Sequence, residues 1–200
     1  MTTQKLYHYT SAPALSSILQ SGYLKATSVH KWRRGEHKGD DPFECCLAIH
    51  LFKQIAPEIA QSSIWQSLEN TLLQQPRYVT SFTKNRDDPY QWEKYGEHGT
   101  GACLVFDMAK LNSHHPKGIA ECIACAYDPT QQVQKLSRIA ESIRKSKGGF
   151  PFNAFNHFWQ ENIAFKREDY AQENEVRYVL NPQKEQFAKL TEPTEAEIAE

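Results

Sequence analysis

Two glutamates and an arginine occupy alternate positions near the C-terminal end of the chain: Glu173, Glu175 and Arg177. Apolar residues alternate with them from Val176 onward, which predicts a strand over Glu173 to Leu180. Such a strand places the three charged side chains on one face. Two carboxylates and a guanidinium on one face are expensive to bury and unusual in a strand, so they are candidates for a site that does chemistry. An exposed edge of charge pairs is an equally good explanation of the pattern.

A histidine lies among aromatic residues near the N-terminus, in Tyr7-His8-Tyr9-Thr10. The predicted strand Lys5 to Tyr9 places Tyr7 and Tyr9 on one face and His8 on the other. A histidine at the end of a strand, followed by a helix start, can offer its ring to a nucleotide. The alternative is a half-buried ring that bonds a backbone carbonyl, and the segment taken alone favours this alternative.

A third segment combines hydroxyl groups with aromatic rings. The predicted strand Arg77 to Thr83 carries Thr80 and Ser81 next to Phe82, and it leads into a short predicted helix with Trp92 and Tyr95. Residues three apart share a helix face. Hydroxyls that bond an amide, beside rings that stack, would form a slot for a planar heterocycle. Packing of the two rings in the core explains them equally well.

A locally basic loop runs from His30 to Gly39 and contains Lys31, Arg33 and Arg34. Such a loop can bind phosphates, RNA or an acceptor substrate. A solvated loop without a ligand is the favoured interpretation of the charges alone.

The five cysteines predict no metal or redox site. Cys122 and Cys125 fall in a predicted strand, Ile119 to Tyr127, where a spacing of three points the side chains to opposite faces. Cys45 and Cys46 belong to an apolar run predicted to be helical. We expect reduced thiols in a reducing compartment.

The elements that must position these residues fit one domain over residues 1–182, followed by a polar tail over 183–200. The chain has 200 residues, 40% hydrophobic and 24% charged, which is ordinary for a globular protein. A net charge of −1 provides no overall field that would attract nucleic acid or a membrane. No apolar leader or membrane-length run is present, so we expect a cytoplasmic protein without a membrane partner.

Further signals give the order of the elements. Ser11, Pro13 and Gly22 are typical of the start and end of a helix, and a strand is predicted over Tyr23 to Thr27. The remaining predictions are two helical runs within 43–75 broken near Pro57, a strand over 101–107, and helices over 129–147 and 152–165. Strands and helices mix without regular βαβ units, which indicates the α+β class.

Taken in order, the motifs resemble a bacterial family catalogued as domain of unknown function 2971. No single motif is specific, but the ordered set is. The segments that carry the resemblance are Tyr7-His8-Tyr9-Thr10, Asp40-Asp41-Pro42-Phe43-Glu44, Ser81-Phe82, Trp92-Glu93-Lys94-Tyr95, Gly101-Ala102-Cys103-Leu104-Val105-Phe106 and Glu173-Asn174-Glu175-Val176-Arg177. One position departs from the family pattern, because Asp40 stands where asparagine is expected.

That family in turn resembles the ADP-ribosyltransferase superfamily. The resemblance implies split β-sheets with flanking helices and NAD, without a metal, in a cleft between the sheets. It implies that His8 holds the adenosine-side ribose, that Tyr95 or Trp92 stacks on nicotinamide, and that Glu175 is catalytic. Glu173 would orient or deprotonate the acceptor. The other residues expected to bind the cofactor are Tyr9, Thr10, Ser81, Phe82 and Arg177.

The expected function is therefore that of an NAD-dependent ADP-ribosyltransferase or NAD glycohydrolase. The acceptor would be a protein or a nucleic acid, and the resemblance suggests a toxin or phage-defence effector with an antitoxin partner. A different class stays open, namely a non-catalytic module that binds a nucleotide or RNA on the same fold. An RNA phosphotransferase ranks lower, because only the loop from Lys31 to Lys38 is basic.

Overall fold

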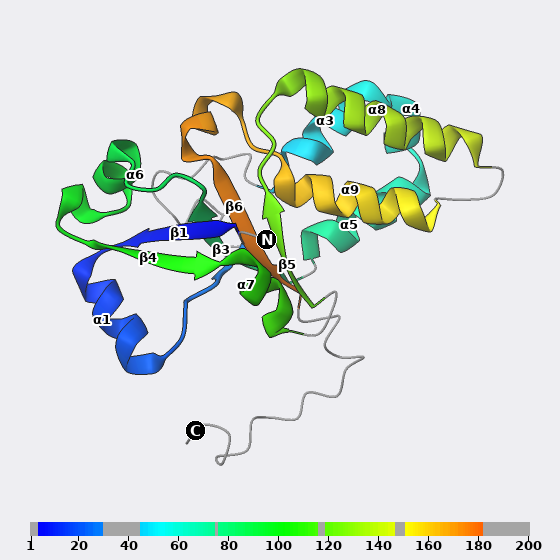
Figure 1. The fold of residues 1–200 in the computed structure, drawn as a ribbon. Helices are drawn as coiled ribbons and strands as arrows, with labels where there is room; N and C mark the ends of the chain where they lie inside the picture. The colour runs from blue at the N-terminus through cyan, green and yellow to red at the C-terminus, as the bar shows by residue number, and fades with distance from the viewer. Residues whose placement is uncertain (1–3, 30–44, 75, 116–118, 147–150, 182–200) are drawn as a thin grey trace, which may run out of the picture.

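The computed structural model describes residues 4–29, 45–74, 76–115, 119–146 and 151–181, and it has the predicted α+β architecture (Figure 1). Its strands are β1 (Lys5–Thr10), β2 (Thr27–Ser28), β3 (Tyr78–Thr83), β4 (Ala102–Asp107), β5 (Ala120–Ala124) and β6 (Glu175–Leu180). Its α-helices are α1 (Ala12–Ser21), α3 (Leu47–Ile55), α4 (Pro57–Ala60), α5 (Ser63–Gln74), α6 (Pro89–Lys94), α7 (Met108–His114), α8 (Pro129–Lys145) and α9 (Phe152–Ala164). Two short 3₁₀ helices are η1 (Glu97–Gly99) and η2 (Glu168–Glu173).

All six strands join one antiparallel sheet in the order β4-β1-β3-β6-β5, with β2 paired to β3. Strand β1 pairs with β4 along its whole length, whereas its pairing with β3 is confined to Tyr7 and Thr83. Strand β2 covers the other end of the same edge of β3, opposite Tyr78 and Val79. The strands thus form a single sheet with a narrow junction between β1 and β3, and not the split sheets that the resemblance implied.

Apolar clusters cover both faces of the sheet, and alternate side chains of β6 pack into the cluster on each face. Val176 and Tyr178 pack in a cluster with Leu6 and Phe82, next to residues of α7. Val179 belongs to the opposite face, with Ile163 of α9. Helices α3, α4, α5, α8 and α9 form a larger apolar core of their own at one side of the molecule (Figure 1). Burial on both faces explains why β6 is hydrophobic where it is not charged.

Local signals predicted the first helix well. Ser11 Oγ accepts a hydrogen bond from the backbone N–H of Ala14, and Pro13 lies in the first turn. Gly22 ends the helix with φ of 71°, a left-handed conformation that glycine adopts without steric cost.

Three predicted elements were wrong in extent. The strand expected over 23–27 is reduced to Thr27–Ser28, and Tyr23 is 69% exposed, because β3 offers a partner only from Tyr78 to Val79. The predicted strand over 119–127 ends at Ala124. Cys45 and Cys46 precede α3 in a turn instead of lying within a helix.

Glu173 is not part of β6, contrary to the prediction. It ends the 3₁₀ helix η2, and Asn174 follows with φ of 44°, so the strand begins only at Glu175. Asparagine is among the residues that tolerate this left-handed conformation, which interrupts the extended chain between the two glutamates.

No helix in the described ranges is long and apolar enough to cross a membrane.

Candidate functional site

A pocket of about 150 Å³ lies at the junction of β1 and β3. Residues of α6, η2 and β6 also line it. Most of the predicted site residues line it: His8, Tyr9, Ser81, Phe82, Tyr95, Glu173 and Glu175. The remaining lining residues are Tyr7, Thr83, Gln91 and Lys166. The structure therefore brings the N-terminal histidine and the C-terminal glutamates to one cavity.

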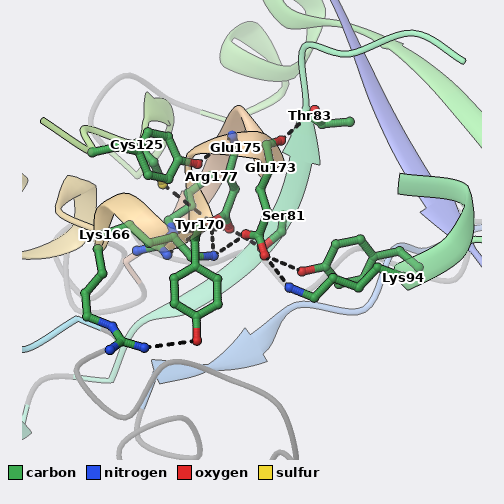
Figure 2. A network of polar contacts seen from close by, with 12 residues as sticks. Ser81, Thr83, Lys94, Cys125, Lys166, Tyr170, Glu173, Glu175 and Arg177 are labelled. Atoms are coloured by element: carbon green, nitrogen blue, oxygen red, sulfur yellow. Dashed lines mark hydrogen bonds and ion pairs between the residues drawn. The ribbon is translucent and has the colours of Figure 1, made fainter. Parts of the chain in front are cut away.

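The carboxylate of Glu175 is buried and held by several donors (Figure 2). Its Oε1 accepts hydrogen bonds from Ser81 Oγ at 2.6 Å and Arg177 Nε at 3.2 Å. Its Oε2 accepts from Lys166 Nζ at 2.9 Å and Arg177 Nη2 at 3.2 Å, with Cys125 Sγ at 3.5 Å. Donors on both oxygens fix the orientation of this carboxylate.

The carboxylate of Glu173 is equally buried but is held from other elements. Its Oε1 accepts from Lys94 Nζ and Tyr95 Oη, both at 2.7 Å, and its Oε2 accepts from Lys166 Nζ. Figure 2 shows this carboxylate between the side chain of Lys94 and that of Glu175. Glu173 thus reaches the same pocket as Glu175 from outside the strand, since η2 brings its side chain back toward β6.

Lys166 is the central cation of the site, and its side chain is only 8% exposed. It follows α9 and donates to both Glu173 and Glu175. Burial alone would lower the pKa of Lys166, but the two carboxylates outweigh this effect and raise it, so the ammonium stays charged. Lys166, Lys94 and Arg177 are thus three cations that pair with the carboxylates of Glu173 and Glu175.

The neighbouring cations also shift the pKa of Glu173. Burial works to raise its pKa, but Lys166 first, and then Lys94 and Tyr95, lower it below the ordinary value. Both the charge and the hydrogen bonds favour the ionised form. Glu173 is therefore an anion at neutral pH and a weak base.

This pKa shift predicts a pH-dependent contribution to stability. Because the folded pKa lies below the unfolded one, the contribution is complete above about pH 4 to 5 and is lost as pH falls through the folded value. The difference in unfolding free energy between the native chain and Glu173→Gln should therefore be largest near pH 7 and shrink below about pH 4. Urea denaturation at several pH values measures it, and a difference that does not change with pH would contradict the assignment.

The ring of His8 has a defined protonation state. Its Nδ1 lies 2.9 Å from the carbonyl oxygen of Ser81, and because a carbonyl only accepts, Nδ1 must carry the proton. Burial lowers the pKa of His8, against the opposing effect of that carbonyl, so the ring is neutral and Nε2 is an acceptor. The backbone bond expected of a structural histidine is present, and the ring lines the pocket as well.

The two aromatic residues of the predicted slot, Trp92 and Tyr95, have different positions relative to the pocket. Tyr95 follows the last residue of α6, lines the pocket and donates its hydroxyl to Glu173. Trp92 does not line the pocket; its ring packs edge-on against Tyr9 with centroids 4.9 Å apart, and its Nε1 donates to Asp87. Trp92 is thus a half-buried ring that packs beside Tyr9 outside the pocket, whereas Tyr95 lines the pocket.

Other predicted site residues lie away from the pocket or outside the described chain. Thr10 is buried and absent from the pocket lining. Arg177 is fully buried behind Glu175 and also donates to the carbonyl of Ile163, so it positions a carboxylate and does not face the cavity. The basic loop with Lys31, Arg33 and Arg34 and the Asp40-to-Glu44 motif lie outside the described residues.

The five cysteines all lie within the described residues, and none of them is joined in a disulfide. No cluster of metal-binding side chains occurs within the part of the chain that the structure describes. Cys122 packs against the cluster that contains Val176 and Tyr178, whereas Cys125 contacts Glu175. Burial first, and then the charge of Glu175, raises the pKa of the Cys125 thiol, which favours its protonated form.

Sequence reasoning missed Lys166 and Gln91. Lys166 belongs to no motif, although two glutamates predicted near a buried strand require a cation. Gln91 lies one residue before the Trp-x-x-Tyr motif and is 4% exposed, and nothing in the sequence distinguishes it from a surface glutamine.

Comparison with known proteins gives one match. Residues 91–178 match the model of a family described as protein of unknown function (DUF2971). The matched segment contains Gln91, Tyr95, Lys166, Glu173 and Glu175, and it does not include His8. No curated protein and no solved structure gave a significant match. The predicted family resemblance is thus confirmed for this segment, while the likeness to ADP-ribosyltransferases stays a prediction.

Proposed function

We propose that this chain binds NAD with the nicotinamide riboside end in the pocket and cleaves the bond between nicotinamide and ribose. The observation that carries the proposal is the pair of buried carboxylates, Glu173 and Glu175, at a cavity with aromatic walls. Transfer of ADP-ribose to a protein or nucleic acid, or to water, would complete the reaction.

The electrostatics of the pocket suit a transition state with positive charge on the sugar. As the bond from C1′ to the ring nitrogen breaks, its electron pair neutralises the nicotinamide cation and charge develops on the ribose. A carboxylate already oriented by Ser81 and Arg177 needs no rearrangement to stabilise that charge. Water or an acceptor hydroxyl then bonds C1′ and releases its proton to solvent.

The size and the walls of the cavity suit one ring of the substrate. A volume of about 150 Å³ is similar to that of a cavity that holds benzene, so it takes a nicotinamide or a ribose and not a whole dinucleotide. Tyr7, Phe82 and Tyr95 provide aromatic surface. His8 Nε2 can accept a hydrogen bond from a ribose hydroxyl.

The sheet is compatible with this proposal. An ADP-ribosyltransferase-like arrangement would place the nucleotide between two groups of strands, and here both residues of the single pair that joins β1 to β3 line the pocket. His8 would then lie on one side of the ligand and Glu175 on the other. In this scheme Glu173 orients the acceptor, because its lowered pKa makes it a poor base.

A second candidate is a module that binds a nucleotide without cleaving it. The observation that favours it is the neutralisation of both carboxylates by Lys166, Lys94 and Arg177. Anions that are already paired stabilise a developing cation less than free ones do.

One assay separates the two candidates. The native chain is incubated with NAD, alone and with a bacterial lysate, and free nicotinamide and labelled acceptors are measured over time. Nicotinamide release that increases with enzyme concentration supports cleavage. A rise in thermal stability with NAD but without release supports the binding module. If millimolar NAD produces neither nicotinamide release nor a rise in thermal stability, both candidates are excluded for this ligand.

A further inference from the structure

A buried glutamine in the pocket has no role in the proposed cleavage. Gln91, on α6, lines the cavity and is 4% exposed. Its Nε2 donates to the backbone carbonyl of Glu173 at 3.1 Å. The hydroxyl of Thr83 donates to the same carbonyl at 2.7 Å, so both acceptor positions of that oxygen are used.

This contact fixes the orientation of the Gln91 amide. A flipped amide would place Oε1 against the carbonyl oxygen of Glu173, and two acceptors repel each other. Oε1 is therefore the group left for another partner. It has none within the described ranges, and it is not among the side-chain atoms sealed from solvent without a partner. An accessible acceptor in a narrow pocket can accept only from a ligand or water.

We propose that Gln91 Oε1 accepts a hydrogen bond from an N–H group of the ligand and selects a primary carboxamide over groups of the same shape without a donor. This inference rests on the proposed function, since nicotinamide carries such a carboxamide.

The neighbouring charges strengthen the selection against acids. A carboxylate in place of the carboxamide would meet Gln91 Oε1 and the anions Glu173 and Glu175 in the same small cavity. The buried ammonium of Lys166 already donates to both of those anions. A site built to bond an N–H discriminates strongly against an analogue without one, because its own acceptor then stays unpaired.

The test compares ligands that differ in one group. Nicotinamide and 3-acetylpyridine have nearly the same shape, but a methyl group replaces the NH₂ in the second, and nicotinate replaces the amide by a carboxylate. Calorimetry on the native chain should show nicotinamide binding about tenfold or more tighter than either analogue. The same comparison with NAD and its 3-acetylpyridine analogue tests the whole ligand.

Two matched variants connect the preference to the residue. Gln91→Met removes the acceptor at nearly constant size and should bring the affinities for nicotinamide and 3-acetylpyridine within about twofold of each other. Gln132→Met is the control, because Gln132 is also buried and donates to two backbone carbonyls but does not line the pocket. It should keep the native preference.

The outcomes distinguish this inference from the proposed function. A carboxamide preference that Gln91→Met abolishes supports the inference, even if NAD is never cleaved. Nicotinamide release without a preference in the native chain overturns the inference and leaves the proposed function intact. A preference that survives in a folded Gln91→Met variant overturns it, as does the absence of binding by all the ligands. If Gln91→Met does not fold, the ligand series on the native chain decides.

Discussion

Replacement of Lys166 by methionine is expected to lower the free energy of unfolding by about 3–5 kcal/mol. The side chains of Lys166, Glu173 and Glu175 are 8%, 5% and 6% exposed, respectively. Methionine is unbranched like lysine and only one atom shorter, but it removes the cation that both carboxylates share, which leaves buried negative charge without its main partner. Urea denaturation at pH 7 measures the change.

Two further variants show whether charge is the cause. In Lys166→Met/Glu173→Gln one anion is removed together with the cation, so this double variant should be more stable than Lys166→Met alone. Lys135→Met is the control, since Lys135 pairs with Glu161 at 2.9 Å but is 42% exposed. The Lys135→Met substitution should lower the free energy of unfolding by less than about 1 kcal/mol. Equal losses for Lys166→Met and Lys135→Met would contradict the central role of Lys166.

The position of Lys166 shows where prediction from the sequence ended. A lysine after an apolar helix is ordinarily explained by the partial negative charge at the helix C-terminus, so Lys166 attracted no functional interpretation. Its contacts with Glu173 and Glu175 depend on how η2 returns the chain to β6. That path is set by a left-handed residue, Asn174, which the alternating pattern conceals.

Local features were predictable because they depend on neighbouring residues. The cap at Ser11, the helix end at Gly22 and the strand from Tyr78 to Thr83 all follow from short patterns. The strand order and the narrow junction at Tyr7 and Thr83 do not, since they depend on pairing between segments far apart in the sequence. The convergence of His8 and Glu175 was expected only from the ordered motifs.

Glu175→Gln is expected to decrease nicotinamide release from NAD by about a hundredfold or more, if the proposed cleavage is correct. The substitution keeps the size of the side chain and its acceptor for Ser81, but it removes the charge beside the developing cation on ribose. Initial rates of release at saturating NAD measure the effect, and the urea midpoint of each variant shows how much of it comes from instability.

Glu173→Gln is the matched comparison, because it removes one charge from the same cluster. Lys94 and Tyr95 cover Oε1 of Glu173, whereas Oε1 of Glu175 bonds the exposed Ser81 hydroxyl at the pocket. The charge of Glu175 should therefore act more directly on the ribose, and Glu173→Gln should decrease the rate by only about tenfold. Glu161→Gln, outside the pocket, should leave it unchanged.

The comparison between these two variants decides the roles of the glutamates. A larger loss in Glu173→Gln than in Glu175→Gln, at similar stability, would assign the catalytic charge to Glu173 instead. A folded Glu175→Gln variant with the native rate would rule out Glu175 as the stabilising charge. Unchanged NAD affinity with loss of release in Glu175→Gln would show that the charge acts on the transition state and not on the bound substrate, which is the property that separates an enzyme from a binding module.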